Sequence, residues 1–313
     1  MHETALVNLS QLVKAKAKEL GFDLCGIARA RKLQSAEAAL TEWCGEGMHD
    51  KMNYLAHDTA KRADPSILFP GAKTVIVTGL NYFTRNRQKH ASVPIISIYA
   101  LGKNYHDVII PKLNRLLACI QSAVPGTNGR AYCDTAPVME KSWAVEAGLG
   151  WRGKHSVIIN ESIGSFFFIG ILLLDIEMDY DAPCPDEKCG SCRACIDSCP
   201  VGAINDNRTI DTRKCIASLT IESKEALPEH MVPLMGRLVY GCDICQETCP
   251  WNRNTKEHNI HELIISSELA GMDINDWLDI DEIQFRKILS GTPAGRVRYE
   301  RFKRNIETVS RNF

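Results

Sequence analysis

Eight cysteines lie between residues 189 and 249 of this 313-residue chain, and their spacing is that of iron–sulfur ligands. The first run, from Cys189 to Pro200, reads C-x2-C-x2-C-x3-C-P. In such a run three thiolates bind one [4Fe–4S] cluster, and the fourth, before proline, reaches a second cluster. The run therefore predicts a second motif in the same chain.

The second motif, from Cys242 to Pro250, reads C-x2-C-x3-C-P and lacks one cysteine, because its expected first position is Val239. Cys215 can supply the missing ligand. The spacing predicts one cluster on Cys189, Cys192, Cys195 and Cys249, and another on Cys199, Cys215, Cys242 and Cys245. Two zinc sites are the alternative, because paired C-x2-C units also bind zinc.

The composition favours reduced thiols. Thirteen cysteines in 313 residues are too few for a disulfide scaffold, and we see neither a secretory signal nor an apolar run of membrane-spanning length. We therefore expect a cytoplasmic protein with no membrane partner. The five cysteines outside the two sets are expected to be buried small hydrophobes: Cys25, Cys44, Cys119, Cys133 and Cys184.

About 180 residues precede the cysteine runs, and a bare ferredoxin would not need them. Apolar spacing predicts helices over 9–20, 108–120 and 137–147, and strands over 22–28, 74–80, 95–99 and 166–174. Alternation of strands and helices predicts a layered α/β domain. Because two clusters carry single electrons, we expect an enzyme whose redox centre lies in this domain.

Four stretches resemble the epoxyqueuosine reductase family, and together they extend over nearly the whole chain. They are Ser97–His106 (SIYALGKNYH), Tyr132–Glu140 (YCDTAPVME), Ala147–Lys154 (AGLGWRGK) and the cysteine module with its flanks, from Arg213 to Asn252.

The resemblance implies a cobalamin-binding α/β (α+β) domain related to corrinoid reductive dehalogenases, joined to a ferredoxin-like domain with two [4Fe–4S] clusters. The clusters would pass electrons to cobalamin, and the enzyme would reduce epoxyqueuosine to queuosine at the wobble position of tRNA. The implied partners are the anticodon stem-loop of wobble-guanine tRNAs and an external one-electron donor such as flavodoxin or ferredoxin.

The resemblance also implies roles for single residues. Asp134 falls on the proton-donor position, although Asp-Thr before Ala-Pro is by itself a helix N-cap signal. A donor that works near neutral pH would need a pKa raised by burial. The implied cobalamin contacts are Arg62, Asp134, Lys154, Ile158, Cys242 and Asp243. Tyr105 and His106 are expected to be wall residues.

Several residues depart from the family pattern where corrinoid or substrate contacts are expected. They are Leu101, Asn104, Lys141, His155, Leu174 and Ser218. They weaken single contact assignments more than the overall interpretation.

We expect three modules: the cobalamin domain at 1–180, the cluster domain at 181–255 and a basic helical segment at 256–313. The last segment holds eight Lys or Arg between residues 286 and 311, opposed by two Glu. Clustered cations bind phosphates, so it is the candidate tRNA contact, through Arg296, Arg298, Arg301, Lys303 and Arg304. A solvated amphipathic helix is the alternative.

Longer relatives are expected to continue into a helical repeat region, of which residues 285–312 would be the beginning.

Two other functions fit the same sequence. One is a corrinoid-dependent reductase of a small molecule, similar to a dehalogenase. The other is a non-catalytic electron carrier with a partner-binding domain, which would bind no cobalamin.

Overall fold

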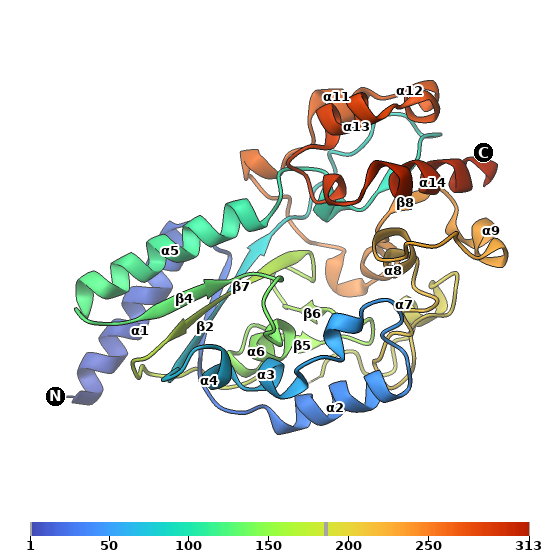
Figure 1. Ribbon diagram of the computed structural model, residues 1–313. Helices are drawn as coiled ribbons and strands as arrows, with labels where there is room; N and C mark the ends of the chain where they lie inside the picture. Colours follow the sequence, from blue (N-terminus) through green and yellow to red (C-terminus); the bar gives the residue numbers. More distant parts are fainter. Residues whose placement is uncertain (1, 185–186, 313) are drawn as a thin grey trace.

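A four-stranded antiparallel sheet forms the centre of the first half of the molecule (Figure 1). The computed structural model describes residues 2–184 and 187–312. The strand order is β1-β2-β7-β4, and each neighbouring pair is antiparallel. The strands are β1 (Leu24–Arg29), β2 (Thr74–Asn81), β4 (Gly129–Tyr132) and β7 (Phe167–Leu174).

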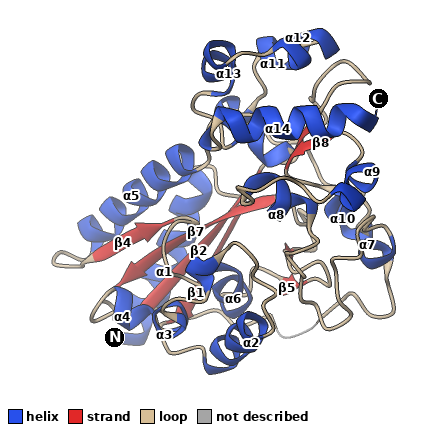
Figure 2. Cartoon of the chain, turned by 45° about the vertical axis from the view of Figure 1, so that its right-hand side comes forward, coloured by secondary structure: helices blue, strands red, loops and turns tan. Residues whose placement is uncertain are grey.

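Both faces of this sheet are covered by helices, so β2 is buried along its whole length. Ile76 and Leu80 pack with α1 (His2–Glu19) and α5 (His106–Ala123), whereas Val75 and Val77 pack with α6 (Glu140–Glu146). Alternate side chains of a strand point to opposite faces. Figures 1 and 2 show α1 and α5 together on one side of the sheet and α6 on the other.

Short elements complete this half. They are α2 (Gln34–Gly45), η1 (Asn53–Leu55), α3 (Thr59–Ala63), α4 (Pro65–Leu68), η2 (Ile98–Ala100), β5 (Trp151–Arg152) and β6 (Ile158–Ile159). The strand expected over 95–99 is shorter than predicted. Only β3 (Ile95–Ile96) is paired, and it runs parallel to β8 (Leu238–Tyr240), which directly precedes the second cysteine motif.

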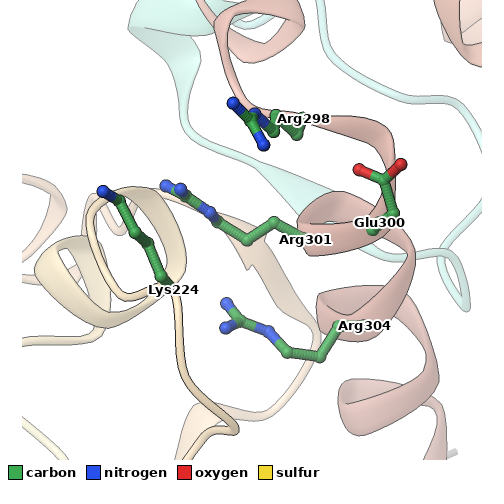
Figure 3. Close-up of a pocket in the computed structure, with 5 residues that line it drawn as sticks. All are labelled: Lys224, Arg298, Glu300, Arg301 and Arg304. Atoms are coloured by element: carbon green, nitrogen blue, oxygen red, sulfur yellow. The ribbon is translucent and has the colours of Figure 1, made fainter.

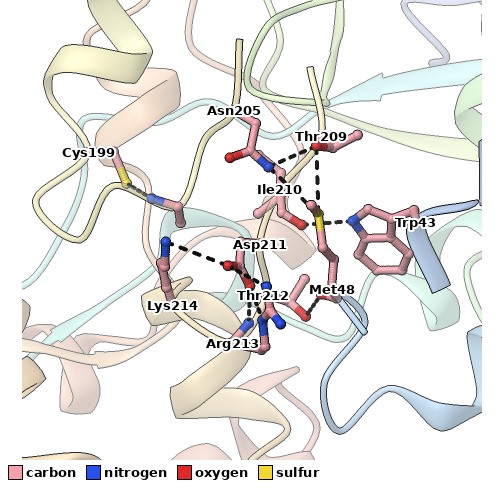
Figure 4. A network of polar contacts seen from close by, with 11 residues as sticks. Trp43, Met48, Cys199, Asn205, Thr209, Ile210, Asp211, Thr212, Arg213 and Lys214 are labelled. Carbon is pink, nitrogen blue, oxygen red and sulfur yellow. Dashed lines mark hydrogen bonds and ion pairs between the residues drawn. The ribbon is translucent and has the colours of Figure 1, made fainter. Parts of the chain in front are cut away.

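Short helices separate the cysteines of the cluster module. They are α7 (Ala194–Asp197), α8 (Ile216–Ile221), η3 (Glu229–Met231), α9 (Val232–Met235), α10 (Ile244–Glu247) and η4 (Pro250–Asn252). The segment between Cys199 and Cys215 is anchored on the α2–η1 connection (Figure 4). Trp43 Nε1 donates to the Ile210 carbonyl at 2.9 Å, and the Thr212 amide donates to the Met48 carbonyl at 3.0 Å.

The remaining helices pack above β8. They are η5 (His261–Leu263), α11 (Ser267–Gly271), α12 (Ile274–Asp279), α13 (Glu282–Leu289), η6 (Ala294–Arg296), α14 (Tyr299–Val309) and η7 (Ser310–Asn312). Capping boxes at Asp273 and Asp281 explain where α12 and α13 begin.

One hydrophobic core joins these helices to α8, β8 and residues 93–101. Packing therefore crosses the expected boundaries at 180 and 255, and the three-module division stays a prediction about the sequence. Among the described helices, none combines the length and the apolar character that a membrane crossing requires.

Candidate active site and cluster ligands

Within each of the two expected groups, several cysteines lie close enough to influence one another's pKa. In the first, the charges of Cys189, Cys195 and Cys192 all raise the pKa of Cys249, after the larger effect of burial. In the second, burial raises the pKa of Cys242 to about 12, and Cys215 and Cys199 raise it further. The pKa of Cys245 is raised mainly by burial, then by Cys242 and Cys215.

The two groups differ in their access to solvent. Cys192 of the first group is exposed, whereas no thiol of the second group is. In the described part of the chain, no three His, Cys, Asp or Glu side chains could hold a metal ion. A four-iron cube is larger than one ion, so its ligands need not converge on a single point.

Asp134 lies between β4 and α6, in the left-handed backbone region with φ of +60°. Its Oδ2 accepts a hydrogen bond from the Tyr105 hydroxyl at 2.7 Å and lies 3.6 Å from His106 Nε2. The helix N-cap interpretation is wrong, because α6 begins at Glu140 with Met139 as its N-cap. The carboxylate faces the start of α5 instead, where Tyr105 and His106 are its partners, and this contact agrees with a structural rather than a ligand role for both.

The expectation of a raised Asp134 pKa is also wrong. The His106 imidazole has the largest effect and lowers the pKa of Asp134, while burial acts in the opposite direction. Tyr105 and the charge of Arg296 lower this pKa further. Asp134 is therefore ionised near neutral pH and must gain a proton before it can donate one.

Glu140 holds the loop that carries Asp134. Its Oε1 accepts a hydrogen bond from the Asp134 amide, across the turn that leads into α6. Burial raises the pKa of Glu140 to about 8, although that hydrogen bond opposes the shift. The two carboxyl groups therefore differ in charge near neutral pH, with Asp134 ionised and Glu140 protonated.

Asp134 and Lys141 interact electrostatically with each other. Both side chains are reached by solvent, and that of Asp134 is 52% exposed. Burial nevertheless has the largest effect on Lys141 and lowers its pKa. Lys141 also interacts with Cys245, which relates Asp134 to the second cysteine group.

Three buried polar atoms without partners are able to bind a polar ligand. Arg62 Nε, His155 Nε2 and Ser218 Oγ are buried and make no hydrogen bond within the described chain. Buried polar atoms are normally hydrogen-bonded, so these three can bind groups that a ligand brings. Burial lowers the pKa of His155 to about 4, and its imidazole is therefore neutral. The donor set fits a large ligand rich in amides, such as cobalamin.

Arg62 lies on α3 beside an aromatic residue that the sequence interpretation missed. Its Nη2 donates to the Tyr54 carbonyl at 2.7 Å, and its guanidinium lies 5.8 Å from the Tyr54 ring centre. The Tyr54 side chain is exposed, and Asp134 and Arg296 both influence its pKa, after the larger effect of burial. No local pattern in the sequence relates Tyr54 to Asp134, which is 80 positions away in the chain.

The other expected cobalamin contacts are engaged within the protein. Asp243 is buried and accepts hydrogen bonds from the Ser97 hydroxyl and, at 2.7 Å, from the Ile98 amide. The Lys154 amine donates to the carbonyls of residues 190 and 192, in the loop of the first cysteine group. Ile158 is buried in the core under α6, and Cys242 is half-buried. Their contacts with cobalamin stay predictions.

The five basic residues expected to contact tRNA occupy three different positions. Arg296 forms an ion pair with Glu222 at 3.2 Å and acts on Asp134. The Lys303 amine donates to the carbonyls of Leu278 and Ile280, near the end of α12. The remaining three line one cavity together with Lys224: Arg298, Arg301 and Arg304.

Two family models match this chain. Residues 188–252 match the 4Fe-4S double cluster binding domain. Residues 62–135, which include Arg62 and Asp134, match the model described as Epoxyqueuosine reductase QueG, DUF1730. The first match shows that the chain binds two [4Fe–4S] clusters.

Curated relatives extend the match over almost the full length. Epoxyqueuosine reductase of Cyclobacterium marinum is 41% identical over 301 residues, which cover 96% of this chain and 96% of that protein. The Escherichia coli enzyme is 38% identical over 312 residues, which cover 98% of this chain and 82% of that one.

Solved structures agree with these relatives. Bacillus subtilis epoxyqueuosine reductase, with its catalytic loop swung out of the active site, matches at a TM-score of 0.90 and 26% identity. The match covers 97% of this chain and 82% of that one. An epoxyqueuosine reductase with a tRNA-Tyr epoxyqueuosine-modified stem loop matches at 0.85 and 25%, covering 97% and 81%. These matches confirm an α/β domain joined to a two-cluster domain and helices. The chain belongs to the epoxyqueuosine reductase family.

Proposed function

We propose that this protein reduces epoxyqueuosine to queuosine at the wobble position of tRNA. The observation that carries the proposal is the 41% identity to a curated epoxyqueuosine reductase over 96% of both chains. The aspartate expected to donate a proton is also reached by solvent and interacts with Lys141, which interacts with Cys245 of the second cysteine group.

The reaction removes one oxygen as water, so it takes two electrons and two protons. Asp134 supplies a proton to the departing oxygen once it has gained one itself. Tyr105 and His106 hold its carboxylate toward the start of α5, and Glu140 fixes the backbone of its loop. Arg296 places a positive charge near the same carboxylate.

Cys189, Cys192, Cys195 and Cys249 hold one cluster, and Cys199, Cys215, Cys242 and Cys245 hold the other. The second cluster is the nearer to Asp134, because Lys141 interacts with both Cys245 and Asp134. The first cluster receives single electrons from an external donor such as flavodoxin or ferredoxin, since Cys192 is exposed.

In this proposal cobalamin binds beside Asp134. When bound, it supplies a strongly reducing cobalt centre for cleavage of the carbon–oxygen bond. Arg62, His155 and Ser218 offer it unpaired polar atoms, and Asp134 offers a solvent-exposed carboxylate. The expected contacts of Lys154, Ile158, Cys242 and Asp243 belong to this proposal as well.

Complementation tests the reaction. The chain would be expressed with cobalamin in a bacterial strain that lacks its own epoxyqueuosine reductase. Queuosine and epoxyqueuosine would then be quantified in digested tRNA by mass spectrometry. We expect queuosine with the wild-type chain and epoxyqueuosine alone with Asp134→Ala.

Soluble protein with filled clusters and bound cobalamin that leaves epoxyqueuosine unchanged would refute the proposal. It would favour a corrinoid-dependent reductase of a small molecule. Asp134→Asn, which keeps the size of the side chain but cannot ionise, is the matched variant that separates proton donation from shape.

A further inference from the structure

Four cations from two distant parts of the chain gather around one cavity of about 450 Å³. Lys224 comes from the loop after α8, whereas Arg298, Arg301 and Arg304 come from the start and first turns of α14. Figure 3 shows Arg301 extended from α14 toward Lys224, with Arg298 above it and Arg304 below it. Glu300 is the single carboxylate in the lining.

None of these four cations forms an ion pair with a carboxylate in the described part of the chain, although seventeen pairs between Lys or Arg and a carboxylate occur elsewhere in it. Surface cations are usually neutralised by nearby carboxylates, so four unpaired ones create a positive field that favours an anion. Lys224 and Arg298 make no side-chain hydrogen bond at all within that part. Their donors are therefore free.

The other two arginines build the cavity. Arg301 donates to the Ile221 carbonyl at 2.8 Å, and Arg304 donates to the carbonyls of Ser223 and Glu225. They fix the loop that carries Lys224 against α14. Each guanidinium retains N–H groups beyond these bonds, because Arg has five donors.

Arg296 relates the cavity to Asp134. Glu222 lies in the same loop as Lys224, and its ion pair holds Arg296, two residues before Arg298. Arg296 in turn acts on Asp134 and on the exposed Tyr54. An RNA chain bound in the cavity would therefore lie on the side of the molecule from which Arg296 acts on Asp134.

We propose that this cavity binds backbone phosphates of the RNA substrate next to the reacting nucleotide. The inference rests on the proposed function and adds Lys224, which no basic run in the sequence indicates. A phosphodiester matches the site because it carries a delocalised negative charge that arginine forks and a lysine amine bind well. Lys303 takes no part, because its amine is bound on the side of α12.

Binding of an unmodified anticodon stem-loop RNA, followed by fluorescence anisotropy across a salt series, tests this inference without turnover. The variant is Lys224→Glu with Arg298→Glu, since neither side chain supports the fold. Lys303→Glu is the matched control for Arg298→Glu alone, because both make the same charge change on the same helix. We expect roughly tenfold or greater loss of affinity in the double variant and a salt slope reduced by about 0.7–0.9 per lost contact.

An unchanged affinity and slope in the double variant would overturn the inference. So would an equal loss in Lys303→Glu, because the effect would then follow net charge alone. Circular dichroism and iron content of each variant show whether it is folded. If wild type binds the RNA through this cavity but produces no queuosine from modified tRNA, the proposed reaction fails while the RNA site stands.

Discussion

Asp134 and Glu140 are six residues apart, and their surroundings move their pKa values in opposite directions. His106 lowers the pKa of Asp134, and burial raises that of Glu140 to about 8. Paired carboxyl groups with separated pKa values are a common basis for acid–base chemistry. The neutral Glu140 carbonyl oxygen still accepts from the Asp134 amide, so it holds the loop without adding a second negative charge.

Glu140→Gln keeps the side-chain oxygen that accepts from the Asp134 amide, and it removes the carboxyl group that titrates. Below about pH 8, folded protein keeps a proton on Glu140 that the unfolded chain loses near pH 4.5. The folded state therefore binds more protons between pH 5 and 8, and the free energy of unfolding falls as pH rises. The lowered pKa of Asp134 also stabilises the folded state, but this contribution is constant above about pH 5 and does not affect the slope. We expect the apparent Tm of wild type to fall more steeply over this range than that of Glu140→Gln.

Glu307→Gln is the control, because Glu307 is exposed on α14. Parallel pH dependences of wild type and Glu140→Gln would contradict the assigned protonation of Glu140. In turnover at pH 7, Glu140→Gln should retain more activity than Glu140→Ala, which loses the acceptor for the Asp134 amide.

For single residues, the sequence predicts which side chains are functional candidates better than it predicts what surrounds them. The motif around Asp134 predicts that this residue is a candidate proton donor, and the structure places it beside Tyr105 and His106. Its left-handed backbone and its partners from α5 depend on contacts across 29 positions, which no local pattern encodes. The N-cap signal in the sequence therefore predicted the wrong backbone conformation for Asp134. The role assigned to Asp134 predicted the wrong direction for the shift of its pKa.

Among the elements, α14 joins the C-terminal helices to the cluster module. Asn305 is fully buried, and its amide donates to the carbonyls of Thr220 and Val239 at 2.9 and 3.0 Å. Its Oδ1 accepts from Arg304. One side chain thus satisfies two buried carbonyls, one at α8 and one in β8.

Asn305→Ala should destabilise the protein, because it leaves both carbonyls without that donor. Each unsatisfied buried group costs about 1–3 kcal/mol, so we expect a total of roughly 2–4 kcal/mol. The apparent Tm should fall by several degrees, measured on protein with both clusters filled. Glu307→Ala on the same helix should change it little, and an equal fall in both variants would assign the effect to helix propensity.

The same junction explains why the sequence predicted only some of the helices and strands correctly. Long apolar runs predicted β2 and β7 correctly, because a strand that is buried on both faces consists mostly of apolar residues. The strand expected over 95–99 ends after two residues, because residues 97 and 98 turn to meet Asp243. That contact joins positions about 145 apart in the chain. Gly241 has a φ of +72°, and an added Cβ would lie 2.6 Å from Ser97 Cβ, so the approach requires glycine.

For the whole molecule, the predicted exchange of ligands between the two cysteine runs would bind distant segments together. Cys249 closes the second run, yet the thiols that act on it belong to the first. Spacing alone predicts this exchange, and it stays a prediction. A single hydrophobic core over residues 93–101 and 216–309 was not predictable, because it depends on packing between modules.

Cys249→Ala tests the exchange at this scale. If ligands are shared, the variant loses or degrades the cluster of Cys189, Cys192 and Cys195, while that of Cys242 and Cys245 remains. Iron per chain should fall from about eight toward four, with one [4Fe–4S] signal left by electron paramagnetic resonance after reduction. Electrons from an external donor should then reach the remaining cluster slowly, because the exposed cluster is missing. Cys184→Ala is the matched control, since its side chain packs beside Cys249 but is assigned to neither cluster. Full iron in Cys249→Ala, or loss of the Cys242 cluster instead, would show that each run binds its own cluster.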